Sequence, residues 1–225
     1  SKIIKQNLKE VKEFATILDP IMVEGKAKLP SKFRITAEAC KIAGKNDLKK
    51  NKILVIGGGS SEEIDDVRVI TNKSTGKMAK HLAEVAFNMG ADVELWMGAT
   101  TEVVGEWIDL QKFKSIEDLS KKIKKLSKYD AILVPAALSD FVPVKNKGKI
   151  SSQKIPEIKL KKAKKVIELL RKKHKGKLCA FKLESGLTDN KLIEKGKTLL
   201  KNADIVVANH SEVLGDENTK SVSYT

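Results

Sequence analysis

Two stretches of small and polar residues have the composition of an anion-binding site. Gly57, Gly58 and Gly59 follow a buried apolar run, and glycine lets backbone amides approach an anion closely. Further along, the segment 72–76 (NKSTG) forms the entry to a predicted helix, whose unpaired amides and positive dipole end favour negative charge. Together they predict a site for a phosphorylated ligand. A tight turn and an ordinary serine helix cap are the simpler structural alternatives.

The glycine turn departs from the two common nucleotide-binding patterns. A dinucleotide fold needs GxGxxG opening directly into a helix and an acidic residue that ends the second strand. Gly57 and Gly59 fit, but Glu62 takes the third glycine position and the second predicted strand ends without a carboxylate. The phosphate-loop pattern fails because Gly76-Lys77 is followed by methionine. A nicotinamide or flavin oxidoreductase is therefore the weaker alternative, which NADPH binding in a titration would revive.

Apolar runs and helical spacings alternate from residue 52 onward. The runs predict strands at 52–59, 91–98, 129–137, 177–183 and 203–209. Helical spacing predicts helices between them, at 74–89, 116–126, 163–173 and 189–200. Continuous apolar strands separated by helices form a mostly parallel sheet covered on both faces. The predicted fold class is α/β, a Rossmann-like domain, with a long irregular segment at Phe141–Pro156.

Residues 1–50 have a different character. Helical spacing over Lys2–Phe14 is broken by Asp19-Pro20, and a short helix capped near Ser31 runs to about Ala43. The polar residues up to 50 read as a linker. Two regions are therefore predicted, an N-terminal extension at 1–50 and a ligand-binding domain at 51–225.

The composition limits the class of protein. Of 225 residues, 41% are hydrophobic, which is too apolar for intrinsic disorder, and the longest apolar runs are far short of the ~20 residues that span a bilayer. The first ten residues lack the apolar core of a signal peptide. Cys40 and Cys179 lie far apart, without a CxxC pattern, which suits a reducing compartment. The sequence predicts a cytoplasmic protein with no membrane partner.

The formal net charge of +15 raises a nucleic-acid-binding alternative. Only three of the 44 basic residues are arginine, the side chain preferred for bidentate recognition of bases and phosphates, so specific nucleic-acid binding is not expected. The densest stretch, Lys159–Lys177, holds ten basic residues and the single acid Glu168. It reads as a solvated helix face or as an anion-attracting rim. Nonspecific binding would weaken steeply with salt.

Five segments in order resemble the phosphopantothenate–cysteine ligase family. They are IGGGSSEEIDDVRVITNKSTGKM at 56–78, VPAALSDFVP at 134–143, GKI at 148–150, AFKLES at 180–185 and DIVVAN at 204–209. The resemblance covers Lys52 to Thr225, so it identifies 51–225 as the ligase domain. Residues 1–50 resemble the tail of the flavin-dependent decarboxylase half that precedes this ligase in many bacteria and archaea. No flavin and no decarboxylation are expected of this chain itself.

The resemblance implies an activity in coenzyme A biosynthesis. Such enzymes join 4′-phosphopantothenate to L-cysteine through an acyl-nucleotide, releasing pyrophosphate and a nucleoside monophosphate. Bacterial and archaeal members generally use CTP and eukaryotic members ATP. Here the base stays open, because KKAKKVIEL at 161–169 replaces a proline-containing nucleotide loop and FKLES resembles the eukaryotic version. Mg²⁺ would be held mainly by phosphate oxygens and water, so no protein metal ligands are expected.

The resemblance also implies roles for individual residues. Contacts to the nucleotide would come from Gly58, Ser74, Gly76, Asp140, Lys149, Phe181, Lys197, Lys201 and Asn209. Contacts to the acyl substrate would come from Arg68, Asn72, Ala136, Ala137 and Asp140. Asn72 would support conversion of the acyl-nucleotide, and Lys149 would close over it on a mobile flap. Arg68 would reach the substrate across the interface of a homodimer. Lys197 and Lys201, spaced i, i+4, would share a helix face.

Overall fold

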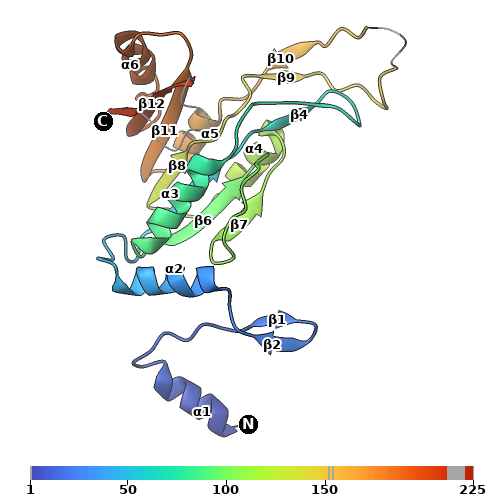
Figure 1. The fold of residues 1–225 in the computed structure, drawn as a ribbon. Coiled ribbons are helices and arrows are strands. Elements are labelled where there is room, and N and C mark those ends of the chain that lie inside the picture. Colours follow the sequence, from blue (N-terminus) through green and yellow to red (C-terminus); the bar gives the residue numbers. More distant parts are fainter. Residues whose placement is uncertain (1, 152, 154, 212–220, 225) are drawn as a thin grey trace.

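A seven-stranded sheet forms the centre of the chain (Figure 1). The structure is a computed structural model that describes residues 2–151, 153, 155–211 and the backbone of 221–224. The strand order is β13-β12-β11-β8-β3-β6-β7, with β13 antiparallel to β12 and all other neighbours parallel. The strands are β3 (Lys52–Gly57), β6 (Asp92–Met97), β7 (Asp109–Lys112), β8 (Ala131–Val134), β11 (Lys177–Glu184), β12 (Ile205–His210) and β13 (Ser221–Tyr224). The predicted α/β fold with a mostly parallel sheet is confirmed.

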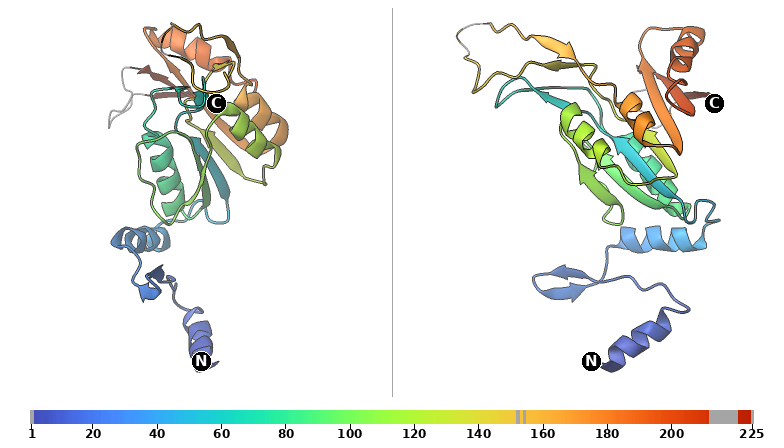
Figure 2. Two further views of the ribbon diagram at one scale, coloured as in Figure 1. Left: turned by 90° about the vertical axis from the view of Figure 1, so that its right-hand side faces the viewer. Right: turned by 180° about the vertical axis from the view of Figure 1, so that it is seen from behind.

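Helices cover both faces of this sheet. Helix α3 (Lys77–Asn88) lies on one face, and α4 (Ile116–Lys124) and α5 (Val166–Lys173) lie on the other (Figure 2). Side chains alternate along β3, so Ile53 and Val55 belong to the core under α3, whereas Leu54 and Ile56 belong to the core with α4 and α5. Helix α6 (Asp189–Lys197) packs against β12.

All four helices predicted in the domain are shorter in the structure. Helix α4 ends at Lys124, where 126 was predicted, and α5 begins at Val166, where 163 was predicted. The helix predicted from residue 74 begins at Lys77, because its N-cap is Gly76, with φ +82° and no side-chain cap. The serine-cap alternative for Ser74 is therefore wrong. The helix predicted over 189–200 ends at Lys197 and continues as a turn.

Two short hairpins build an arm that projects from this edge. Strands β4 (Ser61–Glu63) and β5 (Val69–Thr71) form the first, between the glycine turn and α3. Strands β9 (Phe141–Pro143) and β10 (Leu160–Lys162) pair to form the second. The prediction of an irregular segment over Phe141–Pro156 is thus wrong at its start, where three residues form β9. The two hairpins lie side by side in both views (Figures 1 and 2).

The N-terminal residues lie to one side of the sheet (Figure 1). They form α1 (Lys2–Val11), the hairpin β1 (Ile21–Val23) and β2 (Lys26–Lys28), and α2 (Lys32–Ala43). The Ser31 hydroxyl accepts a hydrogen bond from the Arg34 amide at 3.2 Å, so the predicted cap is confirmed. Helix α2 packs on α3 through Ala37, whereas α1 buries no residue. Within the described residues, no helix combines the length and apolarity needed to cross a bilayer.

Candidate active site

A large cavity opens at the carboxyl ends of the parallel strands. Its volume is about 1100 Å³, and its walls include the turn after β3, the start of α3, and residues after β8 and on β11 and β12. After β3 the chain adds β6 and β7 on one side, then crosses to place β8 on the other. Such a switch point leaves a crevice where ligands bind in open α/β sheets. The topology therefore creates the cavity without any specialised side chain.

Backbone hydrogen bonds fix the glycine turn between two neighbouring strand ends. The Gly59 amide donates to the Ala99 carbonyl at 2.8 Å, and the Ala137 amide donates to the Gly58 carbonyl at 2.9 Å. A Cβ atom on Gly58, whose φ is +73°, would lie 2.7 Å from the Ala99 carbonyl oxygen. Only glycine fits there, because both the backbone angle and the space exclude a side chain.

The segment before α3 is held against the same strand ends. Asn72 donates from Nδ2 to the Ala137 carbonyl at 2.9 Å. The Thr100 hydroxyl donates to the Thr75 carbonyl at 2.6 Å, and a Cβ on Gly76 would lie 2.4 Å from that hydroxyl oxygen. This segment thus lies along the cavity wall in a fixed conformation and leads into the helix N-terminus.

A buried serine links the glycine turn to the tip of β8. Ser60 is fully buried, and its hydroxyl donates to Ser139 Oγ at 3.0 Å while accepting from the Ser139 amide at 3.1 Å. Ser139 directly precedes Asp140 on the cavity wall. Ser60 and Ser139 therefore set the position of Asp140, a connection that the sequence analysis did not find. The sequence signal was a serine shortly after each of two strands, directly after the glycine turn at Ser60 and two residues after Ala137 at Ser139.

The opposite wall contains an amide oxygen without a partner. Asn209, near the end of β12, is 8% exposed and lines the cavity, and its buried Oδ1 has no hydrogen-bond partner among the described residues. A buried acceptor without a donor is unfavourable, so this oxygen is available to a hydrogen-bond donor in the cavity. Phe181 on β11 lines the same region.

Lysines dominate the charge of the cavity wall. Six of them line it, opposed by the two carboxylates of Asp140 and Glu168; the lysines are Lys73, Lys77, Lys164, Lys165, Lys182 and Lys201. This excess suits a ligand that carries several negative charges.

Burial raises the pKa of the Cys179 thiol to about 11, so this cysteine is protonated and unreactive at neutral pH.

The cavity brings together most of the predicted site residues. Ten of the thirteen line it: Gly58, Asn72, Ser74, Gly76, Ala136, Ala137, Asp140, Phe181, Lys201 and Asn209. Arg68, Lys149 and Lys197 are outside its lining. Lys197 and Lys201 do not share a helix face, because α6 ends at Lys197 and Lys201 lies in the following turn. The i, i+4 interpretation of this pair is wrong.

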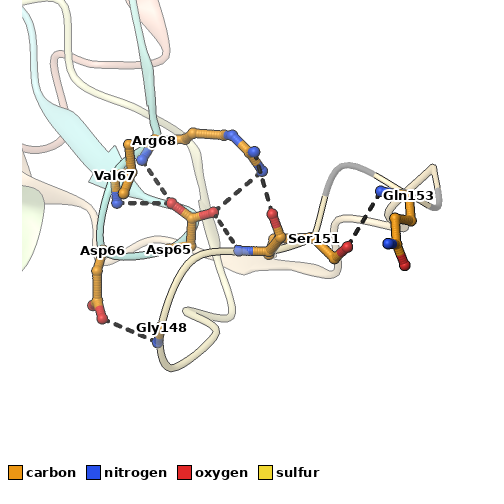
Figure 3. Close-up of polar contacts among 8 residues, drawn as sticks. Asp65, Asp66, Val67, Arg68, Gly148, Ser151 and Gln153 are labelled. Atoms are coloured by element: carbon orange, nitrogen blue, oxygen red, sulfur yellow. Dashed lines mark hydrogen bonds and ion pairs between the residues drawn. The ribbon is translucent and has the colours of Figure 1, made fainter.

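Arg68 lies instead on the arm formed by the two hairpins (Figure 3). Its Nη1 pairs with Asp65 Oδ2 at 3.3 Å, and its Nη2 donates to the Ile150 carbonyl at 3.3 Å. Asp65 Oδ2 also accepts from the Ile150 amide at 3.0 Å, and these amide bonds lower the pKa of Asp65. Lys149, next to Ile150, is therefore on a loop that is tied to the first hairpin.

A second carboxylate of the first hairpin, Asp66, also binds the second hairpin. Asp66 Oδ2 accepts from the Gly148 amide at 3.0 Å (Figure 3). Asp66 Oδ1 pairs with Lys145 Nζ at 2.9 Å. Lys145 also contacts Glu63 at 2.7 Å. The two hairpins are distant in sequence, yet they form one body through carboxylates of the first and backbone amides of the second.

The cavity offers few side-chain donors for a divalent metal ion. The described residues contain no group of three or more His, Cys, Asp or Glu side chains that could hold a metal ion. Asp140 and Glu168 are the carboxylates in the lining of the cavity. A cation at this cavity would therefore need most of its oxygen ligands from its ligand partner and from water.

Comparison with known proteins places these features in a family. The family model of the DNA/pantothenate metabolism flavoprotein C-terminal domain matches residues 48–223. The coenzyme A biosynthesis bifunctional protein CoaBC of Thermococcus kodakarensis is 33% identical over 98% of this chain and 56% of its own length. The protein of the same name from Methanocaldococcus jannaschii is 35% identical over 92% and 53%. The chain thus spans about half the length of these relatives.

A solved structure agrees with the sequence comparison. The DNA/pantothenate metabolism flavoprotein from Streptococcus pneumoniae has a TM-score of 0.68 and 26% sequence identity. The match covers 77% of this chain and 92% of that chain. Fold and sequence therefore point to the same group of proteins.

Proposed function

Because this chain belongs to the family of the DNA/pantothenate metabolism flavoprotein C-terminal domain, we propose that it is a phosphopantothenate–cysteine ligase of coenzyme A biosynthesis. One observation carries the proposal: Asn72, Ala137 and Phe181, from three separate segments, line one lysine-rich cavity. A site on separate surfaces could not bring a nucleotide and a carboxylic acid together.

The proposed reaction has two steps. The carboxylate oxygen of 4′-phosphopantothenate attacks the α-phosphorus of the nucleotide and displaces pyrophosphate. The cysteine amine then attacks the acyl carbon, losing a proton, and displaces the nucleoside monophosphate. The first step brings two anions together, so it needs cations and amide donors more than a nucleophile. The lysines of the wall and the backbone at Gly58, Ser74 and Gly76 are the groups that we assign to this work.

Asn72 and Asp140 lie where the two substrates would meet. The Asn72 side chain is oriented by its hydrogen bond to Ala137, so its amide is positioned before any ligand binds. Ala136 and Ala137 present short side chains beside it, which leaves room for the pantothenate arm. We assign Asn72 to the acyl-nucleotide and Asp140 to both substrates. Phe181, Lys201 and Asn209 are assigned to the nucleotide.

The nucleotide is proposed to be CTP or ATP, in complex with Mg²⁺. The orphaned Oδ1 of Asn209 supports a ligand that donates a hydrogen bond, which a ribose hydroxyl or the exocyclic amine of cytosine or adenine can supply. Mg²⁺ would neutralise phosphate charge, with Asp140 as a nearby carboxylate. In this proposal, the protein side chains bind the two substrates and orient them toward each other.

We propose a homodimer in which the arms of two copies meet. Several apolar side chains on the arm are half or more exposed, among them Val67, Val144 and Leu160. Burial against a second copy would remove these side chains from water. Arg68 and Lys149 would then act on a cavity next to the arm, Lys149 as part of a flap that excludes water from the intermediate.

The domain division and cellular context are proposals of the same kind. We place the ligase at 51–225 and assign 1–50 to the junction with a decarboxylase half, since the relatives are bifunctional proteins. The exposed apolar side chains of α1, such as Ile3 and Ile4, suit contact with such a half. The free thiols Cys40 and Cys179 suit the cytoplasm.

One assay tests the activity. The chain is incubated with 4′-phosphopantothenate, L-cysteine, Mg²⁺ and each of CTP, ATP, GTP and UTP, and pyrophosphate is measured. We expect release with CTP or ATP that requires phosphopantothenate, and formation of phosphopantothenoylcysteine. The proposal fails if none of the four nucleotides yields pyrophosphate, or if release does not depend on phosphopantothenate.

A further inference from the structure

Lys165 lies at a position where a lysine is unfavourable for the helix. It is the N-cap residue of α5, and no side-chain cap hydrogen bond is present there. Helix N-termini favour residues that accept hydrogen bonds from amides, and the positive dipole end disfavours a cation. Such a break of a local rule is expected at functional sites, because stability is given up for another purpose.

Lys165 also contacts Asp140, a residue from a different segment of the cavity wall. It lines the cavity, and its Nζ lies 2.6 Å from Oδ1 of Asp140. The Ala163 amide donates to the Asp140 carbonyl at 2.9 Å, which holds the start of α5 beside the tip of β8. The lysine therefore lies next to the carboxylate that the proposed function assigns to both substrates.

The ion pair between Lys165 and Asp140 is exposed to solvent, so the lysine can exchange its partner. The side chains of Lys165 and Asp140 are 61% and 66% exposed, and exposed ion pairs are weak. A second paired lysine of the wall, Lys182, is held more tightly, since its partner Glu184 is only 18% exposed and also bonds Lys195. Lys165 can thus leave its carboxylate for a stronger anion more easily than Lys182 can.

We propose that Lys165 is a polyphosphate-binding residue that exchanges Asp140 for a phosphate of the nucleotide. This inference rests on the proposed ligase function for the identity of the ligand. The resting ion pair occupies both groups, and the exchange releases the Asp140 carboxylate as the lysine engages a phosphate. A polyphosphate carries more negative charge than one carboxylate, so it attracts this ammonium group more strongly. No bond is made or broken in the exchange.

Titration with inorganic tripolyphosphate tests this role without the base or the acyl substrate. By calorimetry, we expect Lys165→Gln to weaken tripolyphosphate and CTP or ATP binding about tenfold. Lys165→Arg keeps the charge and should bind within about threefold of the wild type. Lys161→Gln removes the same charge four residues earlier, on a side chain outside the described cavity lining, and should leave binding unchanged.

A second variant separates binding from a purely structural role. Serine is a favourable N-cap, so Lys165→Ser should raise the thermal unfolding midpoint while it weakens tripolyphosphate binding. A lysine that only pinned α5 to Asp140 would give a lower midpoint and unchanged binding in this variant.

The outcomes distinguish this inference from the proposed function. Unchanged tripolyphosphate affinity in Lys165→Gln, or no binding by the wild type, overturns the role of Lys165 whatever the pyrophosphate assay shows. Loss of affinity in that variant supports the role, even if the wild type releases no pyrophosphate and the ligase proposal fails.

Discussion

The cavity rim and the arm are both loops at the same edge of the sheet, but different forces hold them. At the rim, backbone groups of Gly58 and Gly59 bond to backbone groups of the neighbouring strand ends. On the arm, the carboxylates of Asp65 and Asp66 accept backbone amides and pair with cations. Rim geometry is therefore independent of ionisation, whereas the arm depends on it. One edge of the sheet thus has both a rim whose geometry does not depend on pH and an arm whose contacts do.

Two glycines with the same backbone conformation give the largest expected contrast. Gly58 and Gly148 have φ of +73° and +70°, but only Gly148 has open space where an added methyl group would lie. Gly58→Ala should lower the free energy of unfolding by about 2–4 kcal/mol, and Gly148→Ala by about 1 kcal/mol. Urea denaturation measures both. Equal losses would contradict the claim that the rim is sterically fixed.

The second largest effect is expected for Asn72→Ala, in which turnover should fall. Loss of a positioned polar group at a reacting centre reduces kcat by roughly 10²–10³-fold. We expect the acyl-nucleotide to accumulate, which quenched-flow chromatography would detect, with pyrophosphate still released in the first turnover. Normal product formation by this variant would exclude the role assigned to Asn72.

Lys149→Gln should have a smaller effect, because we propose that this residue acts on a flap and not at the reacting centre. We expect about tenfold slower turnover, the loss of one charged contact, with an unchanged unfolding midpoint. Lys147→Gln, two residues away on the same loop, is the matched control and should retain wild-type turnover. Equal turnover in both variants would remove Lys149 from the mechanism.

Acid should loosen the arm before the rim. The amide bonds that Asp65 accepts lower its pKa in the folded state below the ordinary 3.8. The stabilisation is therefore complete above the unfolded value and is lost as pH falls below about 3.8 through the folded one. Hydrogen exchange should accelerate at the Ile150 amide, which donates to Asp65, whereas the Gly59 amide stays protected. The Gly148 amide should behave like that of Ile150, because Lys145 and this amide lower the pKa of its acceptor Asp66. Asp65→Asn should abolish the pH dependence at Ile150.

Strand and helix periodicity predicted five of the seven strands of the sheet, because burial on both faces leaves continuous apolar runs such as those of β3 and β8. The edge strands β7 and β13 were not predicted. The hairpins were not predictable in the same way. Three-residue strands such as β4 and β9 bury little, so they leave no clear pattern, and their pairing depends on contacts between segments distant in sequence. The start of α3 was misplaced because Ser74 satisfies a capping rule locally, whereas the positive φ of Gly76 is set by the packing of Thr100 against it.

The candidate site was predictable where backbone and short side chains define it, as at Gly58 and Ala137. It was not predictable at Lys165, because a lysine within a lysine-rich stretch gives no signal until α5 places it beside Asp140. The same limit applies to Ser60 and Ser139, whose hydroxyl contact exists only across the sheet edge.

The Ala137 carbonyl oxygen serves two donors, the Ser60 amide at 3.2 Å and Asn72 Nδ2 at 2.9 Å. If a ligand draws Asn72 away, the oxygen keeps one donor and the remaining bond shortens. Ligand binding should then shift the NMR resonance of the Ser60 amide proton downfield, although this proton does not contact the ligand. This single resonance offers a spectroscopic titration of the cavity's occupancy.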